Sequence, residues 1–326
     1  GSFAHYRAEL DYNFEINEAV AARVVAAYFK DGEFLKDLTG SGSRIYPSLR
    51  WAISDKAELL FNGEYLFSDL PIGSFGQGFT LMPAKFRKLF PALDSEADAI
   101  TALDLDWGMH VSPGGSRGHK DDTLVSKVQF NYNISDELFF RQVLQHRKTD
   151  HRRTVFWGGG NTPDTNPADP DNLHGIYKSL GYRWFESEDD VISLVGDLAW
   201  EPEFKLGNLD LRPITQIGYS YTDSDSDGVR RAYTVKEELR YFNIAYPNFN
   251  AYENHSDALE DGYTLTQNSI SSSNNWNVYV NQELKMFEDR LRMLYGWRRS
   301  YFDNSFKNRL NGDMTNNEGT AAPSQR

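Results

Sequence analysis

An acidic hexapeptide, Asp223-Ser-Asp-Ser-Asp-Gly228, has the spacing of the first half of a calcium-binding loop. In such a loop, oxygen atoms at alternate positions wrap around a hard cation. The twelfth position, where a bidentate Glu completes the ligand set, is Thr234 in this chain. Because that ligand is missing, we interpret the segment mainly as a solvated acidic loop tip, with bound calcium as the lesser alternative.

Histidines offer a second kind of chemistry, as metal ligands or as a catalytic pair. His146 and His151 lie close together in sequence, and His110 and His119 fall in one predicted connection. No Glu or second His stands at the spacing of a helical zinc motif. Ser, His and acidic residues are so abundant that a hydrolase triad cannot be picked out. We therefore assign no catalytic residue, no metal ligand and no cofactor.

The segments that would position such side chains alternate between polar and apolar residues. Within 4–14 every second residue is apolar, which places the two classes on opposite faces of a β-strand. The same period of two recurs in the segments that lead up to Ile53 and Ile134. The apolar positions are Ala4, Tyr6, Ala8, Leu10, Tyr12, Phe14, Ile45, Leu49, Trp51, Ile53, Leu124, Val128, Phe130, Tyr132 and Ile134.

Four similar short turns join these alternating segments, which indicates a hairpin repeated along the chain. The turns are Asn13-Phe-Glu-Ile-Asn17-Glu-Ala, Trp51-Ala-Ile-Ser-Asp55-Lys-Ala, Tyr132-Asn-Ile-Ser-Asp136-Glu-Leu and Lys285-Met-Phe-Glu-Asp289-Arg-Leu.

Composition narrows the class of protein. The 326 residues are 40% hydrophobic, yet no apolar stretch reaches the length of a membrane-spanning helix and no helical period is sustained. Aromatic residues make up 14% and gather near the ends of the alternating segments, as in the girdles of membrane barrels. The net charge of -13 argues against a nucleic-acid partner. The absence of Cys excludes disulfides and thiol catalysis, and fits an oxidising compartment.

These patterns predict an all-β fold, an antiparallel transmembrane β-barrel segment of about ten strands. Short periplasmic turns would alternate with long extracellular loops at 31–43, 68–122, 149–187 and 223–274. The predicted strands are 3–14, 18–30, 44–54, 57–67, 123–134, 137–148, 188–206, 209–222, 275–286 and 289–302.

Charged residues in the middle of these strands are expected to face the barrel interior. On the lipid side a charge at mid-depth costs roughly 2–4 kcal/mol. Inside a whole barrel they would hold a plug by hydrogen bonds and ion pairs, whereas in a soluble sheet the same face would meet water. They are Arg7, Glu9, Arg23, Arg50, Glu58, Glu64, Lys127, Arg141, Glu283, Arg292 and Arg298.

Several stretches, taken in order, resemble the barrel of a TonB-dependent outer-membrane receptor, and the siderophore-receptor branch most of all. The order and spacing of these stretches carry the resemblance, which covers most strands and little of the loops. The stretches are Gly1 to Asn13, Tyr46 to Leu59 with Glu64-Tyr-Leu66, Phe204 to Arg212 leading to Gly218-Tyr219, Asn243 to Pro247, and Tyr279 to Leu284 continuing through Asp289 to Arg299.

The chain also departs from that family pattern. We find neither an N-terminal plug domain with its energy-coupling box nor a closing strand with a terminal aromatic residue. Residues 320–326 form a polar tail of the kind expected in an extracellular loop. Residues 1–326 are therefore expected to be a partial barrel domain without its plug, derived from a longer precursor and unable to transport by itself.

The resemblance implies a binding and transport role without covalent chemistry. It implies residence in the outer membrane of a Gram-negative-type bacterium and uptake of a ferric siderophore or a similar scarce ligand. The implied partners are membrane lipid, the receptor's own plug and the TonB energy-coupling protein. Aromatic and polar loop residues would contact the ligand by stacking and hydrogen bonding. The candidates are Trp107, Trp157, Arg240, Tyr241, Phe242, Tyr246 and Tyr252.

Two other classes remain open. A ten-stranded outer-membrane hydrolase requires strand 289–302 to pair with strand 3–14 and close the barrel. A soluble β-sandwich that binds carbohydrate requires the apolar face to be buried against a second sheet.

Overall fold

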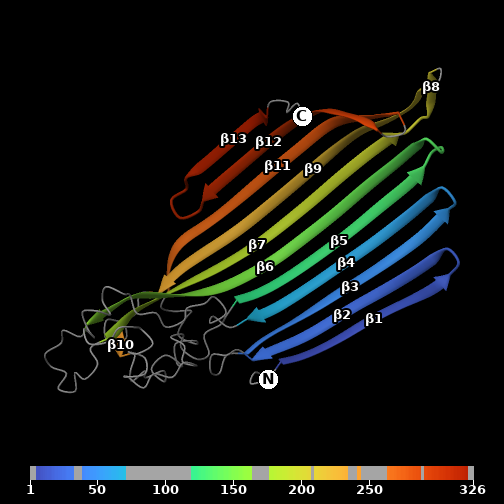
Figure 1. Cartoon of the computed structure of the whole chain (residues 1–326). Coiled ribbons are helices and arrows are strands. Elements are labelled where there is room, and N and C mark those ends of the chain that lie inside the picture. The colour runs from blue at the N-terminus through green and yellow to red at the C-terminus, as the bar shows by residue number, and fades with distance from the viewer. Residues whose placement is uncertain are drawn as a thin grey trace, which may run out of the picture.

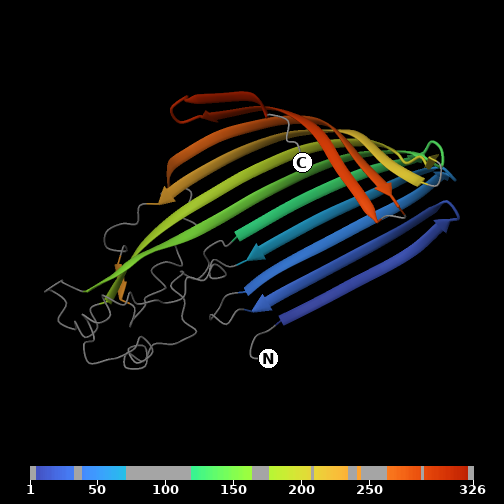
Figure 2. The same cartoon turned by 45° about the horizontal axis from the view of Figure 1, so that its top comes forward.

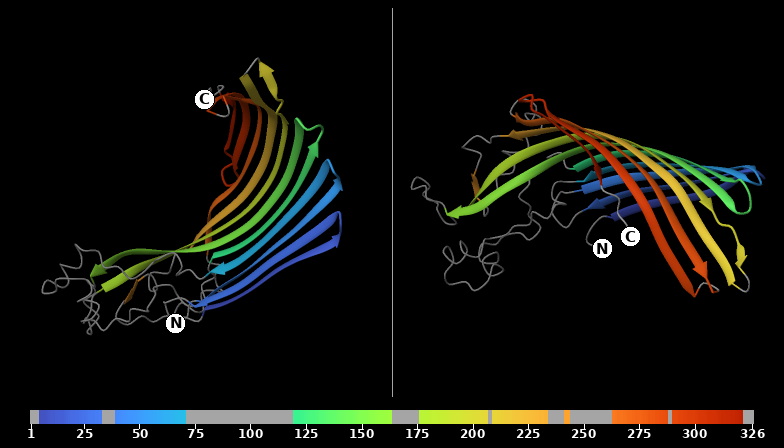
Figure 3. Two further views of the ribbon diagram at one scale, coloured as in Figure 1. Left: turned by 45° about the vertical axis from the view of Figure 1, so that its right-hand side comes forward. Right: turned by 90° about the horizontal axis from the view of Figure 1, so that it is seen from above.

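The chain forms one antiparallel sheet that is curved into a trough (Figures 1 and 3). The computed structural model describes residues 5–32, 39–70, 119–163, 176–206, 209–233, 241–243, 263–287 and 290–321. For 154–163, 176–183, 205–206, 209–210, 233, 241–243, 263, 318 and 320–321 only the backbone is described. The strands are β1 (His5–Asn17), β2 (Val20–Gly32), β3 (Thr39–Ser54), β4 (Ala57–Leu70), β5 (His119–Asn133), β6 (Leu138–Pro163), β7 (Ile176–Trp200), β8 (Phe204–Leu206), β9 (Leu209–Tyr233), β10 (Tyr241–Asn243), β11 (Tyr263–Met286), β12 (Leu291–Asn308) and β13 (Met314–Ala321).

The strand order across the sheet is β1-β2-β3-β4-β5-β6-β7-β9-β11-β12-β13, which can be followed from blue to red in Figure 2. Two short strands lie off this path, since β8 pairs with β9 and β10 pairs with β7. The all-β, antiparallel prediction is confirmed, and each of the ten predicted strands overlaps a strand of the sheet. The described part of the chain contains no helix of the length and hydropathy needed to cross a membrane.

Three details of the predicted strands are wrong. The strand predicted at 188–206 ends at Trp200, and β8 forms a separate pairing with β9. Several strands extend well beyond their predicted ends, so β6, β7, β9 and β11 occupy much of the predicted loops. β13 includes Thr320 and Ala321 of the predicted loop-like tail and follows β12 after residues 309–313. The edge with the long connections therefore also carries a short turn.

Three of the four predicted short turns are stabilised by side chains within them. Asn17 Oδ1 accepts a hydrogen bond from the backbone N–H of Ala19 at 2.9 Å. Ser54 Oγ accepts from the N–H of Ala57 at 3.1 Å, and Ser135 Oγ accepts from the N–H of Glu137 at 3.3 Å. Such side-chain caps favour a turn over a continued strand. The repeated Asn and Ser positions therefore explain why these turns lie together at one end of the strands. This end of the sheet is called the short-turn edge, and the opposite end is called the long-connection edge.

The apolar residues predicted from the alternation share one face, called the outer face, and most of the large ones are exposed on it. Leu10 is 56% exposed and Ile217 is 53% exposed. From β6 to β12 a row of large apolar and aromatic residues crosses this face. The row is Leu144, Leu194, Tyr221, Trp276 and Tyr301.

Beyond that row, toward the long-connection edge, the outer face becomes polar. The next two rows are His146, Ile192, Asp223, Asn274 and Asp303, then Lys148, Asp190, Asp225, Ser272 and Ser305. The apolar band thus ends while the strands continue. Lys148 forms an ion pair with Glu188 in this polar zone, and that carboxylate raises the pKa of the ammonium group.

The structure contradicts both alternative folds within the part of the chain that it describes. β1 pairs with β2 alone, and β12 pairs with β11 and β13, so the pairing of β12 with β1 that a closed ten-stranded barrel needs is not made. The described strands all belong to one sheet, and the apolar face is exposed rather than packed against a second sheet.

Candidate functional site

The polar face of the sheet, called the inner face, is the candidate functional surface. The register places every predicted interior charge on this face. Pockets also lie on it, as expected for the concave side of the trough. One pocket of about 710 Å³ is lined by residues that include Arg23, Tyr46, Asn62, Glu64, Lys127 and Arg147.

Ion pairs join neighbouring strands on the inner face near β1 to β5. Arg23 donates to the Asp11 carboxylate at 2.9 and 2.6 Å. Glu58 accepts from Arg50 and, at 3.1 Å, from Asn131 Nδ2. The arginines of both pairs are well exposed, so each pair adds little to stability. Their charged groups remain accessible to anything that fills the trough.

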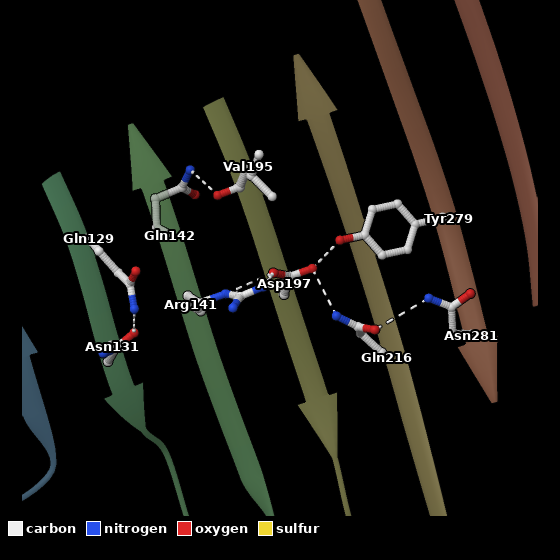
Figure 4. Close-up of polar contacts among 9 residues, drawn as sticks. All are labelled: Gln129, Asn131, Arg141, Gln142, Val195, Asp197, Gln216, Tyr279 and Asn281. Carbon is white, nitrogen blue, oxygen red and sulfur yellow. Dashed lines mark hydrogen bonds and ion pairs between the residues drawn. The ribbon is translucent and has the colours of Figure 1, made fainter. Parts of the chain in front are cut away.

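One carboxylate on the inner face is buried and hydrogen-bonded at both oxygens. Asp197 on β7 is 3% exposed, and its Oδ2 accepts from Arg141 Nε at 3.0 Å. Its Oδ1 accepts from Gln216 Nε2 at 3.1 Å and from the Tyr279 hydroxyl. These four residues, called the Asp197 cluster, come from β6, β7, β9 and β11 (Figure 4). The cluster ties four neighbouring strands together and satisfies its own carboxylate.

Glycines allow tyrosines to lie across the sheet in this region. A Cβ at Gly218 would stand 2.4 Å from Cζ of Tyr279 on the inner face. A Cβ at Gly196 would stand 2.4 Å from Cε1 of Tyr219 on the outer face, where the Tyr219 hydroxyl donates to Gln142 Oε1 at 2.6 Å. Each tyrosine therefore occupies the space above a glycine and reaches a polar side chain on another strand.

A pocket of about 340 Å³ lies on the inner face at the long-connection edge. It is called the loop-side pocket, and two cross-strand rows form its surroundings. The first row consists mainly of large side chains and the second ends in small residues, which hollows the surface between them. The rows are His119, Arg153, Phe185, Arg230 and Gln267, and Asp121, His151, Ser187, Gly228 and Ser269. The pocket lining is His151, Arg153, Phe185, Glu186, Ser187, Gly228, Val229, Arg230 and Gln267, and Glu186 pairs with Arg231.

The lining of the loop-side pocket combines positive charge with an aromatic ring. The Arg230 guanidinium lies over the Phe185 ring, 4.6 Å from its centroid. Arg230 Nε is buried and has no hydrogen-bond partner among the described residues. Gln267 Nε2 donates to Ser269 Oγ at 3.2 Å, which orients the amide beside the pocket. A guanidinium, an amide and a ring together suit a planar, anionic ligand.

The histidines that lie close together in the fold are not the ones that lie close together in the sequence. His146 and His151 lie on opposite faces, and His146 Nε2 is 2.8 Å from Asp190 Oδ1 on the outer face. His151 instead meets His119 across β5 and β6, with ring centroids 4.5 Å apart. His110 lies outside the described residues.

The interpretation of Asp223 to Gly228 as a loop tip or calcium loop is wrong. The segment lies inside β9 and pairs with β7 and β11 on its two sides. In an extended strand, alternate side chains are spaced ~7 Å apart along one face, so their carboxylates cannot wrap around one ion. Asp227 pairs instead with Arg309, with Oδ2 and Nη1 2.9 Å apart.

Three of the seven predicted ligand-contact residues fall on described strands and lie close together. Trp157 is in β6, whereas Tyr241 and Phe242 form β10. Their register partners are all in residues 178–181 of β7. Their contact with a ligand stays a prediction. Trp107, Arg240, Tyr246 and Tyr252 lie outside the described residues.

Solved structures match this chain, whereas neither a protein-family model nor a curated protein sequence does. The unliganded ferric citrate transporter FecA gives a TM-score of 0.66 at 9% identity, over 99% of this chain and 38% of that chain. BauA, the ferric preacinetobactin receptor from Acinetobacter baumannii, gives 0.62 at 13%, over 99% and 42%. The pyoverdine outer membrane receptor FpvA from Pseudomonas aeruginosa PAO1, bound to pyoverdine, gives 0.64 at 16%, over 98% and 41%.

These matches define the fold class. The sheet has the fold of a segment of the barrel in these TonB-dependent siderophore receptors, and the chain spans about two fifths of their length. The neighbours are transporters and receptors rather than enzymes. At such low identity the likeness concerns the fold, so the ligand has to be argued from the residues of this chain.

Proposed function

We propose that this chain forms part of the barrel wall of an outer-membrane receptor that takes up a ferric siderophore or a similar scarce chelate. The observation that carries the proposal is the match of almost the whole chain to siderophore-receptor barrels. Its faces support the same role, because the exposed apolar band suits hydrocarbon and the inner face suits a water-filled, plugged interior.

The loop-side pocket supports the choice of ligand. Ferric chelates are often anionic and carry planar binding groups, which suit the guanidiniums of Arg153 and Arg230 and the ring of Phe185. The pocket lies at the edge of the sheet where the long connections lie, which is the extracellular edge in this proposal. Trp157, Tyr241 and Phe242 are placed by their backbone toward the same edge, and they are proposed as further ligand contacts.

The rest of the mechanism depends on partners. In the whole protein a plug domain would occupy the trough and contact the inner-face charges, and ligand binding would rearrange it. Energy for release would come through the TonB energy-coupling protein. No covalent step is part of this proposal, and the wall residues act by binding and positioning.

Ligand binding by the full chain in detergent micelles tests the proposal. Ferric chelates of the catecholate, hydroxamate and carboxylate types would be titrated while tryptophan fluorescence is recorded. At least one type should bind, and Arg230→Met should weaken that binding roughly 10- to 100-fold, since a hydrogen bond to a charged group is worth ~1.5–3 kcal/mol.

Arg23→Met is the matched control, because Arg23 lies on the same face but pairs with the well-exposed Asp11 away from the loop-side pocket. It should leave chelate binding unchanged. Absence of binding by every type of ferric chelate, or equal binding by the wild type and Arg230→Met, would contradict the proposal.

A further inference from the structure

Beside the loop-side pocket, two histidines and an aspartate converge on one point of the inner face. Asp121 Oδ1 contacts His151 Nδ1, and Asp121 Oδ2 contacts His119 Nε2. One ligand atom from each of the three residues lies within 4.8 Å of the others. The three side chains are half-buried, with relative exposures between 14% and 30%.

The strand pairing fixes this His119–Asp121–His151 cluster. Asp121 and His151 are direct cross-strand partners, and His119 precedes Asp121 by two residues on the same face. The backbone ladder of β5 and β6 therefore holds all three side chains without help from a loop. The cluster lies seven residues beyond Leu144 along β6, roughly 23 Å at ~3.3 Å per residue, and thus outside the apolar band.

We propose that this cluster binds a divalent transition-metal ion such as zinc. Two imidazole nitrogens and one carboxylate oxygen form a ligand set that suits Zn²⁺, Ni²⁺ or Cu²⁺, with open positions left for water. An ion placed between the ligand atoms needs distances of ~2.0–2.2 Å to each, which requires only small side-chain rotations. In its absence the carboxylate hydrogen-bonds both rings and keeps them convergent.

Two features of the surroundings bear on this site. Arg153 is the cross-strand partner of His119, and its positive charge weakens cation binding. The Asp121 charge offsets it, and Thr123 and Thr149, which share a hydrogen bond of 3.3 Å, continue the polar surface below the cluster. Because the strand backbones position all three ligands, no loop has to be ordered when the ion binds, and this favours binding despite the nearby guanidinium.

Other histidine–carboxylate contacts in the described chain show what distinguishes this cluster. His146 pairs with Asp190, and His5 pairs with Asp31, each with one imidazole and one carboxylate. Neither pair belongs to a set of three converging ligands. His146 therefore serves as a matched control with the same residue types and one ligand fewer.

Zinc titration of the full chain in micelles tests the site. After treatment with a chelator, isothermal calorimetry with Zn²⁺ alone should show one ion bound per chain. Cobalt substitution should give the visible absorption of a nitrogen- and oxygen-ligated ion. His119→Ala, Asp121→Asn and His151→Gln should each weaken zinc binding by at least about tenfold, and His146→Ala should leave it unchanged.

The proposal would be overturned if the wild type bound no zinc, or if all three ligand variants still bound zinc as the wild type does. An equal loss of zinc binding in His146→Ala would also overturn the proposal, because it would assign the ion to the outer face. The circular dichroism of each variant reports whether it still folds, and His151→Gln retains a polar side chain of similar length should alanine variants fail. Arg230→Met separates this site from the chelate pocket, since it should weaken chelate binding and retain zinc binding.

Discussion

The Asp197 cluster and the loop-side pocket are built on the same four strands and the same face of the sheet. In the Asp197 cluster, polar groups pair with one another and Tyr279 fills the space above Gly218. In the loop-side pocket, a Cβ added at Gly228 would make only ordinary van der Waals contacts, the nearest at 3.8 Å from Ser269 Oγ.

This difference separates stability from recognition on one continuous surface. Buried polar groups that satisfy each other rigidify a structure and have little left to offer a ligand. In the loop-side pocket, by contrast, Arg230 Nε has no hydrogen-bond partner among the described residues. The inner face is therefore tied together at the level of the apolar band and left open for binding near the long connections.

The largest expected effect comes from Asp197→Ala. It removes the shared acceptor of Arg141, Gln216 and Tyr279, and should destabilise the folded chain by ~2–3 kcal/mol. The value lies at the low end for a broken buried pair, because the Arg141 side chain is 42% exposed and can reach water. Urea unfolding in micelles measures it.

Asp11→Ala is the control for that substitution, since Asp11 also accepts from an arginine on the inner face but is well exposed. Its unfolding midpoint should stay close to that of the wild type. Similar midpoints for the two variants would show that the Asp197 cluster does not tie the strands together.

A pair of glycine substitutions sharpens the same comparison. Gly218→Ala places a methyl group 2.4 Å from Tyr279 Cζ, and overpacking of this kind costs ~2 kcal/mol. Gly228→Ala adds a methyl group at ordinary van der Waals distance from its neighbours and should change stability by less than ~0.5 kcal/mol. Urea unfolding of both variants would measure the contrast.

Gly228→Leu extends the comparison from stability to binding. The larger side chain fills the loop-side pocket and should reduce chelate binding while the unfolding midpoint is retained. A large loss of stability in the Gly228 variants would mean that the pocket is packed rather than open.

The sequence was sufficient to predict the class of fold, because alternation is plain wherever one face is apolar. The strands around Leu10, Trp51 and Tyr132 were located for this reason, and their turns were marked by Asn17, Ser54 and Ser135. The common face of Arg141 and the other interior charges also followed from alternation alone.

The loop-side pocket could not be predicted, because alternation disappears where both faces of a strand are polar. Along β6 beyond Leu144, His146, Lys148 and Arg152 point outward while His151 and Arg153 point inward, so the segment resembles a loop. The pocket combines parts of four strands, and all of these parts fall within the predicted long connections. Cross-strand register across those connections is not encoded locally, so the contact between His119 and His151 had no sequence signal.

The smallest expected effect concerns the outer polar zone, where Lys148 pairs with Glu188. The carboxylate raises the pKa of Lys148 above its ordinary value of 10.5. Because the pKa is raised in the folded state, the pair stabilises the fold fully at any pH below the ordinary value of Lys148. This stabilisation is lost only as the pH rises through the raised pKa. Both side chains are exposed, so water and salt screen the pair.

Lys148→Met should therefore leave the unfolding midpoint unchanged at neutral pH and in moderate salt. The difference between variant and wild type should stay flat up to about pH 9, since Lys148 remains protonated throughout that range. A shift as large as that of Asp197→Ala would show that the polar zone of the outer face holds the strands together as firmly as the buried carboxylate does. Stability would then not be concentrated at the level of the apolar band.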